Sequence, residues 1–165
     1  MKDLLLITPP FTQLNTPYPA TAYLKGFLNT KNISSYQIDL GIEVILEIFS
    51  KKGVTEIFNV KPENLSENAQ RIFALKEEYI KTIDEVIAFL QNKKPTLARQ
   101  ICSMNFLPEA SRFNQLDDME YAFGNMGLQD KAKHLATLYL EDLSDYIVEN
   151  IDENFGFSRY AERLG

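Results

Sequence analysis

The chain has 165 residues, a length typical of one domain or of a small unit with an extension. Hydrophobic residues make up 45% of it, and 11 Phe and 8 Tyr are enough for a packed core, which excludes a globally disordered protein. The formal net charge is −6 and no stretch gathers Lys and Arg, so nucleic acid and anionic membranes are disfavoured as partners.

The compartment is indicated by the cysteine content and by the N-terminus. The single cysteine, Cys102, excludes an internal disulfide and is typical of a reducing compartment. The chain begins Met1-Lys2-Asp3, and only four apolar residues follow before Thr8. This run is too short for the apolar region of a signal peptide and far too short to span a bilayer. We therefore expect a cytoplasmic protein without a membrane partner.

The first forty residues predict a strand, a loop, a helix and a second strand. An apolar run predicts a strand at residues 3–8, and the loop at residues 9–19 contains four of the seven prolines, which stiffen it. A helix is predicted at residues 20–29 and a strand at residues 34–40. This order is typical of two parallel strands joined by a helix, and such sheets bind ligands beyond the carboxyl ends of their strands.

Apolar spacing predicts which sides of the first two helices are buried. For the helix at residues 20–29 we expect a buried stripe, in which Gly26 lets the helix approach a strand closely. That stripe consists of Ala22, Tyr23, Gly26 and Phe27. A second helix is predicted at residues 41–52, with Gly53 as its stop. Its buried face is expected to contain Ile42, Ile45, Leu46 and Phe49.

The rest of the chain is predicted to be mainly helical. Long amphipathic helices are predicted at residues 66–92 and 128–150, with a short terminal segment at residues 158–164. The first of them has Ile72, Tyr79 and Val86 in one row, and the second is expected to be buried through a stripe of six apolar side chains. These are Leu135, Leu138, Tyr139, Leu143, Tyr146 and Ile147.

The predicted fold is therefore an α/β start, Rossmann-like in its β-α-β-α order, followed by a mainly helical bundle. We expect a partial unit at residues 1–60 and a helical extension at residues 61–165 packed on it. Two parallel strands alone do not form a stable sheet, because parallel pairs are normally buried among further strands and helices. Either another subunit completes the sheet or the sequence is the front portion of a longer protein.

Three segments carry a resemblance to a known family. They are Leu5-Leu6-Ile7-Thr8-Pro9-Pro10, Pro19-Ala20-Thr21-Ala22-Tyr23-Leu24 and Tyr36-Gln37-Ile38-Asp39. In this order they resemble the N-terminal region of cobalamin-binding (B12-binding) radical SAM proteins, a group of iron–sulfur oxidoreductases. The resemblance covers about residues 3–50, under a third of the chain.

The resemblance implies a Rossmann-like, cobalamin-binding-type unit ahead of a radical SAM domain. In that domain a 4Fe-4S cluster held by a Cys-x3-Cys-x2-Cys motif would cleave S-adenosylmethionine, and with one cysteine in this sequence the cluster would lie downstream. The Asp-x-His-x-x-Gly loop that supplies a cobalt ligand in many cobalamin domains is missing here. The resemblance thus implies cobalamin without a histidine from this loop.

The candidate site lies where the two predicted strands end. Thr8, Pro9, Pro10 and Thr12 follow the first strand, and Asp39 ends the second. Gln13, Asn15 and Thr16 offer further hydrogen-bonding groups in the same loop. The loop contacts a ligand or a domain, or it is a structural crossover whose prolines restrict the unfolded chain. Asp39 accepts from a ligand hydroxyl, or it caps the following helix.

The other chemistry-bearing residues favour structural interpretations. His134 has no second histidine or cysteine near it in the sequence to make a metal set, and Cys102 is expected to be a buried, unreactive thiol. Glu141, Asp145 and Glu149 repeat every four residues, with Asp142 and Asp152 nearby. A Mg²⁺ site is conceivable there, but a solvated helix face is favoured, as is a surface turn at residues 117–120.

The sequence thus predicts an accessory, cofactor-pocket domain of a cobalamin-dependent-type radical SAM oxidoreductase, without catalytic residues of its own. Its partner would be the downstream radical SAM domain. The alternative is a non-catalytic interaction or structural domain that forms a homodimer through its incomplete sheet. A helical enzyme that uses the acidic face with Mg²⁺ is the weakest hypothesis.

Overall fold

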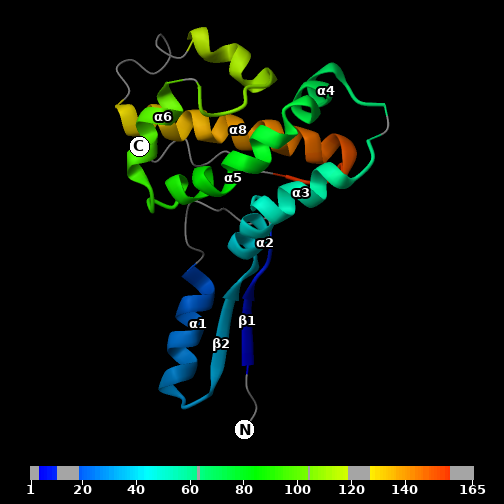
Figure 1. The fold of residues 1–165 in the computed structure, drawn as a ribbon. Coiled ribbons are helices and arrows are strands. Elements are labelled where there is room, and N and C mark those ends of the chain that lie inside the picture. Colours follow the sequence, from blue (N-terminus) through cyan, green and yellow to red (C-terminus); the bar gives the residue numbers. More distant parts are fainter. Residues whose placement is uncertain (1–3, 11–18, 63, 104, 119–126, 157–165) are drawn as a thin grey trace. The chain divides into compact units, whose positions relative to one another are not determined.

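The computed structural model describes residues 4–10, 19–62, 64–103, 105–118 and 127–156. The chain forms two compact units that divide between Glu47 and Ile48. The first unit contains two strands, a helix and most of a second helix, and the described elements of the second unit are helical (Figure 1). An α/β start followed by a mainly helical part was predicted from the sequence, and this order is confirmed.

The first unit is built on one parallel strand pair. Strand β1 (Leu4–Thr8) pairs with β2 (Ser35–Asp39) in parallel, with Leu4 opposite Ser35 and Thr8 opposite Asp39. Helix α1 (Pro19–Thr30) connects the two strands and lies along them (Figure 1). Asn32, at a φ of 54°, turns the chain back after α1, a conformation that asparagine tolerates well.

The orientation of α1 differs from the expected one. Thr21 is buried against the sheet, whereas the predicted apolar stripe is exposed, including Tyr23 and Phe27. A Cβ at Gly26 would meet no atom within 4 Å, so no close approach to a strand occurs there. The physical reason is a polar contact, because Gln37 Nε2 donates to Thr21 Oγ1 at 2.8 Å and so holds the Thr21 side of α1 against the sheet.

The second predicted helix is two helices in the structure. Helix α2 (Leu40–Ile48) ends early, and α3 (Lys51–Asn59) contains Gly53, which is therefore not a helix stop. The helices are separated at Ser50, which has an extended backbone. Ser50 caps α3, because its Oγ accepts a hydrogen bond from Gly53 N at 3.0 Å. Ile45 is buried as expected, as is Phe49 just after α2, while Ile42 is exposed.

The predicted helix at residues 66–92 is likewise interrupted. It consists of α4 (Glu67–Ala74) and α5 (Lys76–Leu90), separated at Leu75, where ψ is 12°. Ser66 caps α4 by accepting from Ala69 N at 3.2 Å. The predicted row of Ile72, Tyr79 and Val86 is fully buried, so the face was predicted correctly although the helix is broken.

Short elements precede the longest helix. They are η1 (Pro95–Leu97), α6 (Ala98–Cys102) and η2 (Ser111–Asp118). Helix α8 (Leu128–Asn150) has the predicted bounds, and it packs against α4, α5 and α6 at the centre of the helical unit (Figure 1). The six apolar side chains predicted to bury it are all buried. The terminal segment predicted at residues 158–164 lies outside the described residues.

An aromatic cluster joins four helices of the second unit. The Phe58 ring of α3 lies 5.1 Å from Tyr146 of α8, 6.2 Å from Phe73 of α4 and 6.3 Å from Tyr79 of α5, measured between ring centroids. Because Phe58 packs in this core, α3 is part of the helical unit, ahead of the boundary expected at residue 60. Within the described parts of the chain, none of the helices combines the length and apolar character that crossing a membrane requires.

Candidate functional site

The parallel register brings two of the predicted site residues together. Thr8 ends β1 directly opposite Asp39 at the end of β2, so both lie at the carboxyl edge of the strand pair. This is the edge at which parallel α/β sheets bind ligands. Pro9 and Pro10 follow at once and are exposed, whereas Thr12, Gln13, Asn15 and Thr16 lie outside the described residues.

The Thr8 side chain points to α1 and is almost fully buried, at 1% exposure. Its hydroxyl lies 3.4 Å from that of Thr21, which also accepts from Gln37 Nε2. This chain of polar groups fastens α1 to both strands. A ligand at this edge would therefore meet the backbone of residues 8–10 rather than the Thr8 hydroxyl.

Asp39 caps the helix that follows it. Its Oδ1 accepts a hydrogen bond from Ile42 N at 3.2 Å, which satisfies one of the free N–H groups at the start of α2. The capping role left open by the sequence is thus present. The side chain remains half-buried at the strand edge, and a carboxylate has further acceptor positions for a ligand N–H or O–H.

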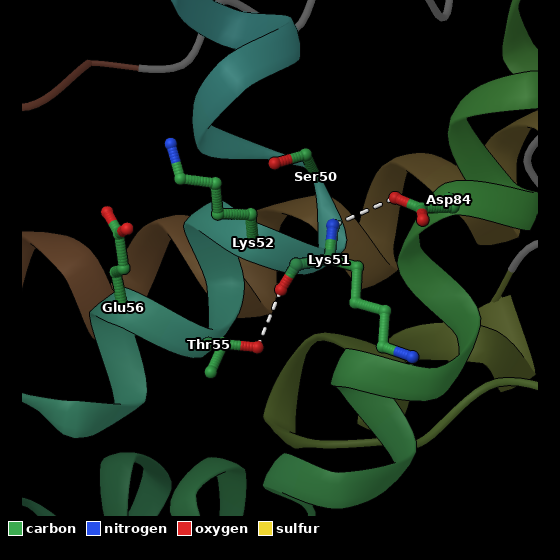
Figure 2. A pocket seen from close by; sticks show the side chains of 6 residues that line it. All are labelled: Ser50, Lys51, Lys52, Thr55, Glu56 and Asp84. Atoms are coloured by element: carbon green, nitrogen blue, oxygen red, sulfur yellow. Dashed lines mark hydrogen bonds between the residues drawn. The ribbon is translucent and has the colours of Figure 1, made fainter.

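A surface pocket that the sequence analysis did not anticipate lies in the helical unit. It has a volume of about 550 Å³ and is lined by residues of α3 and α5 (Figure 2). Asp84 of α5 accepts from Lys51 N at 2.8 Å, so a donor at the start of α3 already has a partner within the protein. The pairing joins residues 33 positions apart, which no local pattern could have indicated. The lining residues are Ser50, Lys51, Lys52, Thr55, Glu56 and Asp84.

The acidic face of α8 is only partly solvated, which differs from the expectation of a solvated face. Glu141 is 4% exposed and Asp142 is fully buried, while Glu149 is exposed. Glu149 instead ties the end of α8 to the start of α4, since its carboxylate accepts from both Ser66 N at 2.6 Å and Ser66 Oγ at 2.7 Å. Three successive turns of α8 thus use their acids for contacts within the protein.

Asp142 is the centre of a buried polar network. Its carboxylate accepts from Ala110 N at 3.1 Å, from Arg112 N at 3.2 Å and from the Tyr79 hydroxyl at 3.4 Å. Burial raises the pKa of Asp142 to about 6, although the two backbone donors oppose this rise. Asp142 therefore holds the segment around residue 110 against α8.

Arg112 is the charge partner of two of these acids. Its guanidinium donates to both oxygens of Asp145, at 2.6 and 2.7 Å, and its Nη1 lies 3.7 Å from Glu141 Oε2. In the described part of the chain no three metal-ligating side chains are grouped to hold an ion. The cluster is a charge-paired structural network, and the Mg²⁺ hypothesis has no support in it.

We expect the Asp142→Asn substitution to change how stability depends on pH. The native protein retains a proton on Asp142 up to about pH 6, whereas the unfolded chain releases it near pH 4. Stability from this group is therefore present below about pH 4 and is lost as the pH rises through about 6. Asparagine resembles the protonated acid and does not titrate.

The free energy of unfolding of the native sequence, minus that of Asp142→Asn, should therefore fall between about pH 4 and pH 7. Urea denaturation at a series of pH values measures this difference. Asp130→Asn, an exposed acid at the start of the same helix, is the matched control. A difference that rises over this pH range would show that Asp142 is stabilised as the anion.

The remaining candidates belong to the helical unit, whereas the strand edge belongs to the first unit. His134 is half-buried on α8. Cys102, also half-buried, donates from Sγ to the Leu128 carbonyl at 3.6 Å, and burial raises its pKa. A raised pKa lowers the thiolate fraction and hence the reactivity of the thiol. The predicted surface turn at residues 117–120 has no described side chains.

The comparisons with known proteins give no further assignment. The chain matches no protein-family model, and neither the curated proteins nor the solved structures yield a significant match.

Proposed function

We propose that the first unit is the opening of a Rossmann-like, cobalamin-binding-type domain, and that the chain is an accessory part of a radical SAM oxidoreductase. Its role is to form one wall of the cofactor pocket at the carboxyl edge of β1 and β2. The iron–sulfur cluster and S-adenosylmethionine belong to a downstream domain, which is also the partner of this chain.

One observation carries the proposal. Thr8 and Asp39 are register partners at the carboxyl edge of a parallel pair, with a Pro-Pro turn directly after Thr8. This is the position at which open α/β sheets bind their ligands. The Asp39 carboxylate is an acceptor for the amide N–H groups that line the edge of cobalamin, and the backbone of residues 8–10 lies beside it.

The residues at this edge fit a cobalamin held without protein ligation to cobalt. The sequence has a single histidine, and His134 belongs to the helical unit. Hence the described residues of the first unit provide a carboxylate and backbone groups but no imidazole. Cobalamin bound here would be held by the Asp39 carboxylate and by the backbone groups of residues 8–10.

Hydroxocobalamin is expected to raise the melting temperature of the chain in a saturable manner. A ligand that binds only the folded state at 100 times its Kd stabilises by about 2.7 kcal/mol. Asp39→Ala should reduce the shift, because it removes the acceptor at the strand edge. Asp84→Ala, which removes another carboxylate that accepts from a helix N-terminus, is the matched control and should keep the full shift.

Two outcomes would contradict this proposal. One is a melting temperature that hydroxocobalamin leaves unchanged at saturating concentration. The other is an equal loss of the shift in Asp39→Ala and Asp84→Ala, because binding would then not depend on the strand edge.

A second function is favoured by the distribution of exposed apolar side chains. Of the 13 large hydrophobic residues that are exposed, nine lie between Leu4 and Ile42 and four in the rest of the described chain. Such a concentration marks an interaction surface. A non-catalytic interaction domain that associates through its incomplete sheet is therefore the alternative.

A further inference from the structure

We propose that the first unit binds a second copy of this chain, with α1 of one copy lying on the open sheet face of the next. The open sheet face consists of Leu5, Ile7 and Tyr36. The α1 stripe consists of Tyr23, Leu24 and Phe27. The association is independent of cobalamin and concerns the apolar sides of the unit rather than its carboxyl edge.

The open sheet face is the side of the strand pair that α1 does not cover. Parallel register partners share a face, so Leu5 and Tyr36 lie on one side and Leu6 and Gln37 on the other. Gln37 contacts Thr21 of α1, which identifies the covered side. On the opposite side Leu5 is 58% exposed, Ile7 48% and Tyr36 60%. Parallel sheets are almost always covered on both faces, so this face is expected to have a partner.

The α1 stripe lies on the outer side of the same unit. Tyr23 is 78% exposed, Phe27 58% and Leu24 51%, whereas Thr21 is buried towards the sheet. Tyr23 and Phe27 are four residues apart and so occupy one side of the helix. The Lys31 ammonium lies 5.6 Å from the centre of the Phe27 ring, at the end of this stripe. The stripe is an apolar helix surface of the kind that normally packs on a sheet.

The two surfaces are alike in being apolar, and each is of a kind that packs on the other. Neither contains a charged residue, and an apolar helix side lying on a parallel sheet is the standard packing of α/β proteins. Each surface exposes about 300 Å² of apolar side chain, given the areas that aromatic and aliphatic side chains bury. One helix-on-sheet contact would bury both surfaces, whereas a contact between two sheet faces would leave the α1 stripes exposed.

The size and symmetry of this contact predict how the chain associates. About 600 Å² of apolar area corresponds to about 1,000 Å² in total, since slightly more than half of an interface is apolar. This area is at the lower limit for a specific interface, so the association is weak. Because the two surfaces lie on opposite sides of the unit, the contact is head-to-tail and leaves one free surface at each end.

Sedimentation velocity from about 1 to about 200 μM tests this association over the range expected of a weak interface. The native chain should show an average mass that rises with concentration. Tyr36→Glu blocks the open sheet face and Tyr23→Glu blocks the α1 stripe, so each variant alone should remain monomeric. Their equimolar mixture should form dimers and nothing larger, because each contributes the surface that the other has lost.

Three controls separate this contact from loss of folding and from general adhesion. Tyr36→Phe and Tyr23→Phe keep the apolar surfaces and should associate like the native chain. Val148→Glu places a charge at an exposed position of α8 in the other unit and should leave association unchanged. The helical circular dichroism signal of the two Glu variants should match that of the native chain.

Any of three results would overturn the proposal. A native chain that stays monomeric at the highest concentration has these surfaces covered in another way. If Tyr36→Glu prevents association but Tyr23→Glu does not, two sheet faces pair directly. A monomeric mixture of the two Glu variants would show that the surfaces do not bind each other. None of these results bears on cobalamin binding, which the melting experiment measures separately.

Discussion

Replacing Asp142 by alanine is expected to lower the free energy of unfolding by about 3–5 kcal/mol. The substitution leaves three donors without their acceptor, namely Ala110 N and the Tyr79 hydroxyl, which are buried, and Arg112 N, which is partly buried. Each buried donor that loses its partner destabilises by about 1–3 kcal/mol. Since a whole domain of this size is stable by only about 5–15 kcal/mol, the effect is a large fraction of the total.

Urea denaturation at neutral pH, followed by circular dichroism, measures this loss. Asp130→Ala removes an exposed acid from the first turn of the same helix and should lower the free energy by less than about 1 kcal/mol. A similar small loss in Asp142→Ala would mean that the segment around Ala110 does not depend on this carboxylate, and the network would not be structural.

Replacing Phe58 by alanine is expected to lower the free energy of unfolding by about 3–5 kcal/mol, as is usual for a buried phenylalanine. Phe58 is 5% exposed, and its ring contacts aromatic rings from α4, α5 and α8. The alanine variant leaves a cavity at the point where four helices meet, and the aromatic pairs themselves are worth about 0.5–1.5 kcal/mol each.

Thermal and urea unfolding of Phe58→Ala should show this loss in the main helical transition. Val60→Ala, two residues further along the chain, is the control, because Val60 is exposed and has little packing to lose. If Phe58→Ala left the main transition unchanged and affected only a separate minor one, α3 would not belong to the core of the helical unit.

The elements that the sequence predicted best are those in which pattern and packing agree. Helix α8 was predicted with its observed bounds, because its apolar side chains follow a helical period for more than six turns. The parallel pair of β1 and β2 followed from two apolar runs separated by a helix. For α8, the residues that the pattern placed in the core are those that the structure buries. For the strands, the helix that connects them is typical of a parallel pair.

The breaks in the helices could not be predicted equally well. Ser50 is a good N-cap residue, but Gly53 is the stronger helix-stop signal in the sequence. The end of the helix was therefore predicted at Gly53. Leu75 favours helix, and the apolar stripe continues on both sides of it, so no residue type indicated the break between α4 and α5.

The buried acids and the orientation of α1 depend on contacts between distant residues. Asp142 pairs with groups that lie 30 to 63 residues away, and the spacing of acids on one helix contains no information about them. Thr21 holds its side of α1 against the sheet by accepting a hydrogen bond from Gln37, which is 16 residues further along the chain. A helical period identifies an apolar stripe, but it does not show whether a polar network elsewhere on the helix determines which side meets the sheet.

The sequence indicated where the candidate residues lie better than it indicated what their side chains contact. The strand order placed Thr8 and Asp39 at one edge, and the register brings them together. The sequence also offered the Thr8 hydroxyl as a ligand group, whereas the structure uses it against Thr21. Capping of α2 by Asp39 was weighed beside ligand binding, and the two roles use different acceptor positions of one carboxylate.

The measurement that tests the central functional claim most directly is equilibrium dialysis of hydroxocobalamin against the chain, with the bound cobalamin measured by its own visible absorbance. We expect saturable binding that ends at one cobalamin per chain. Binding should persist when His134 is replaced by glutamine, because no histidine belongs to the strand edge. A dialysis in which no cobalamin is retained at a large excess of protein would contradict the assignment of this edge as a cobalamin-binding site.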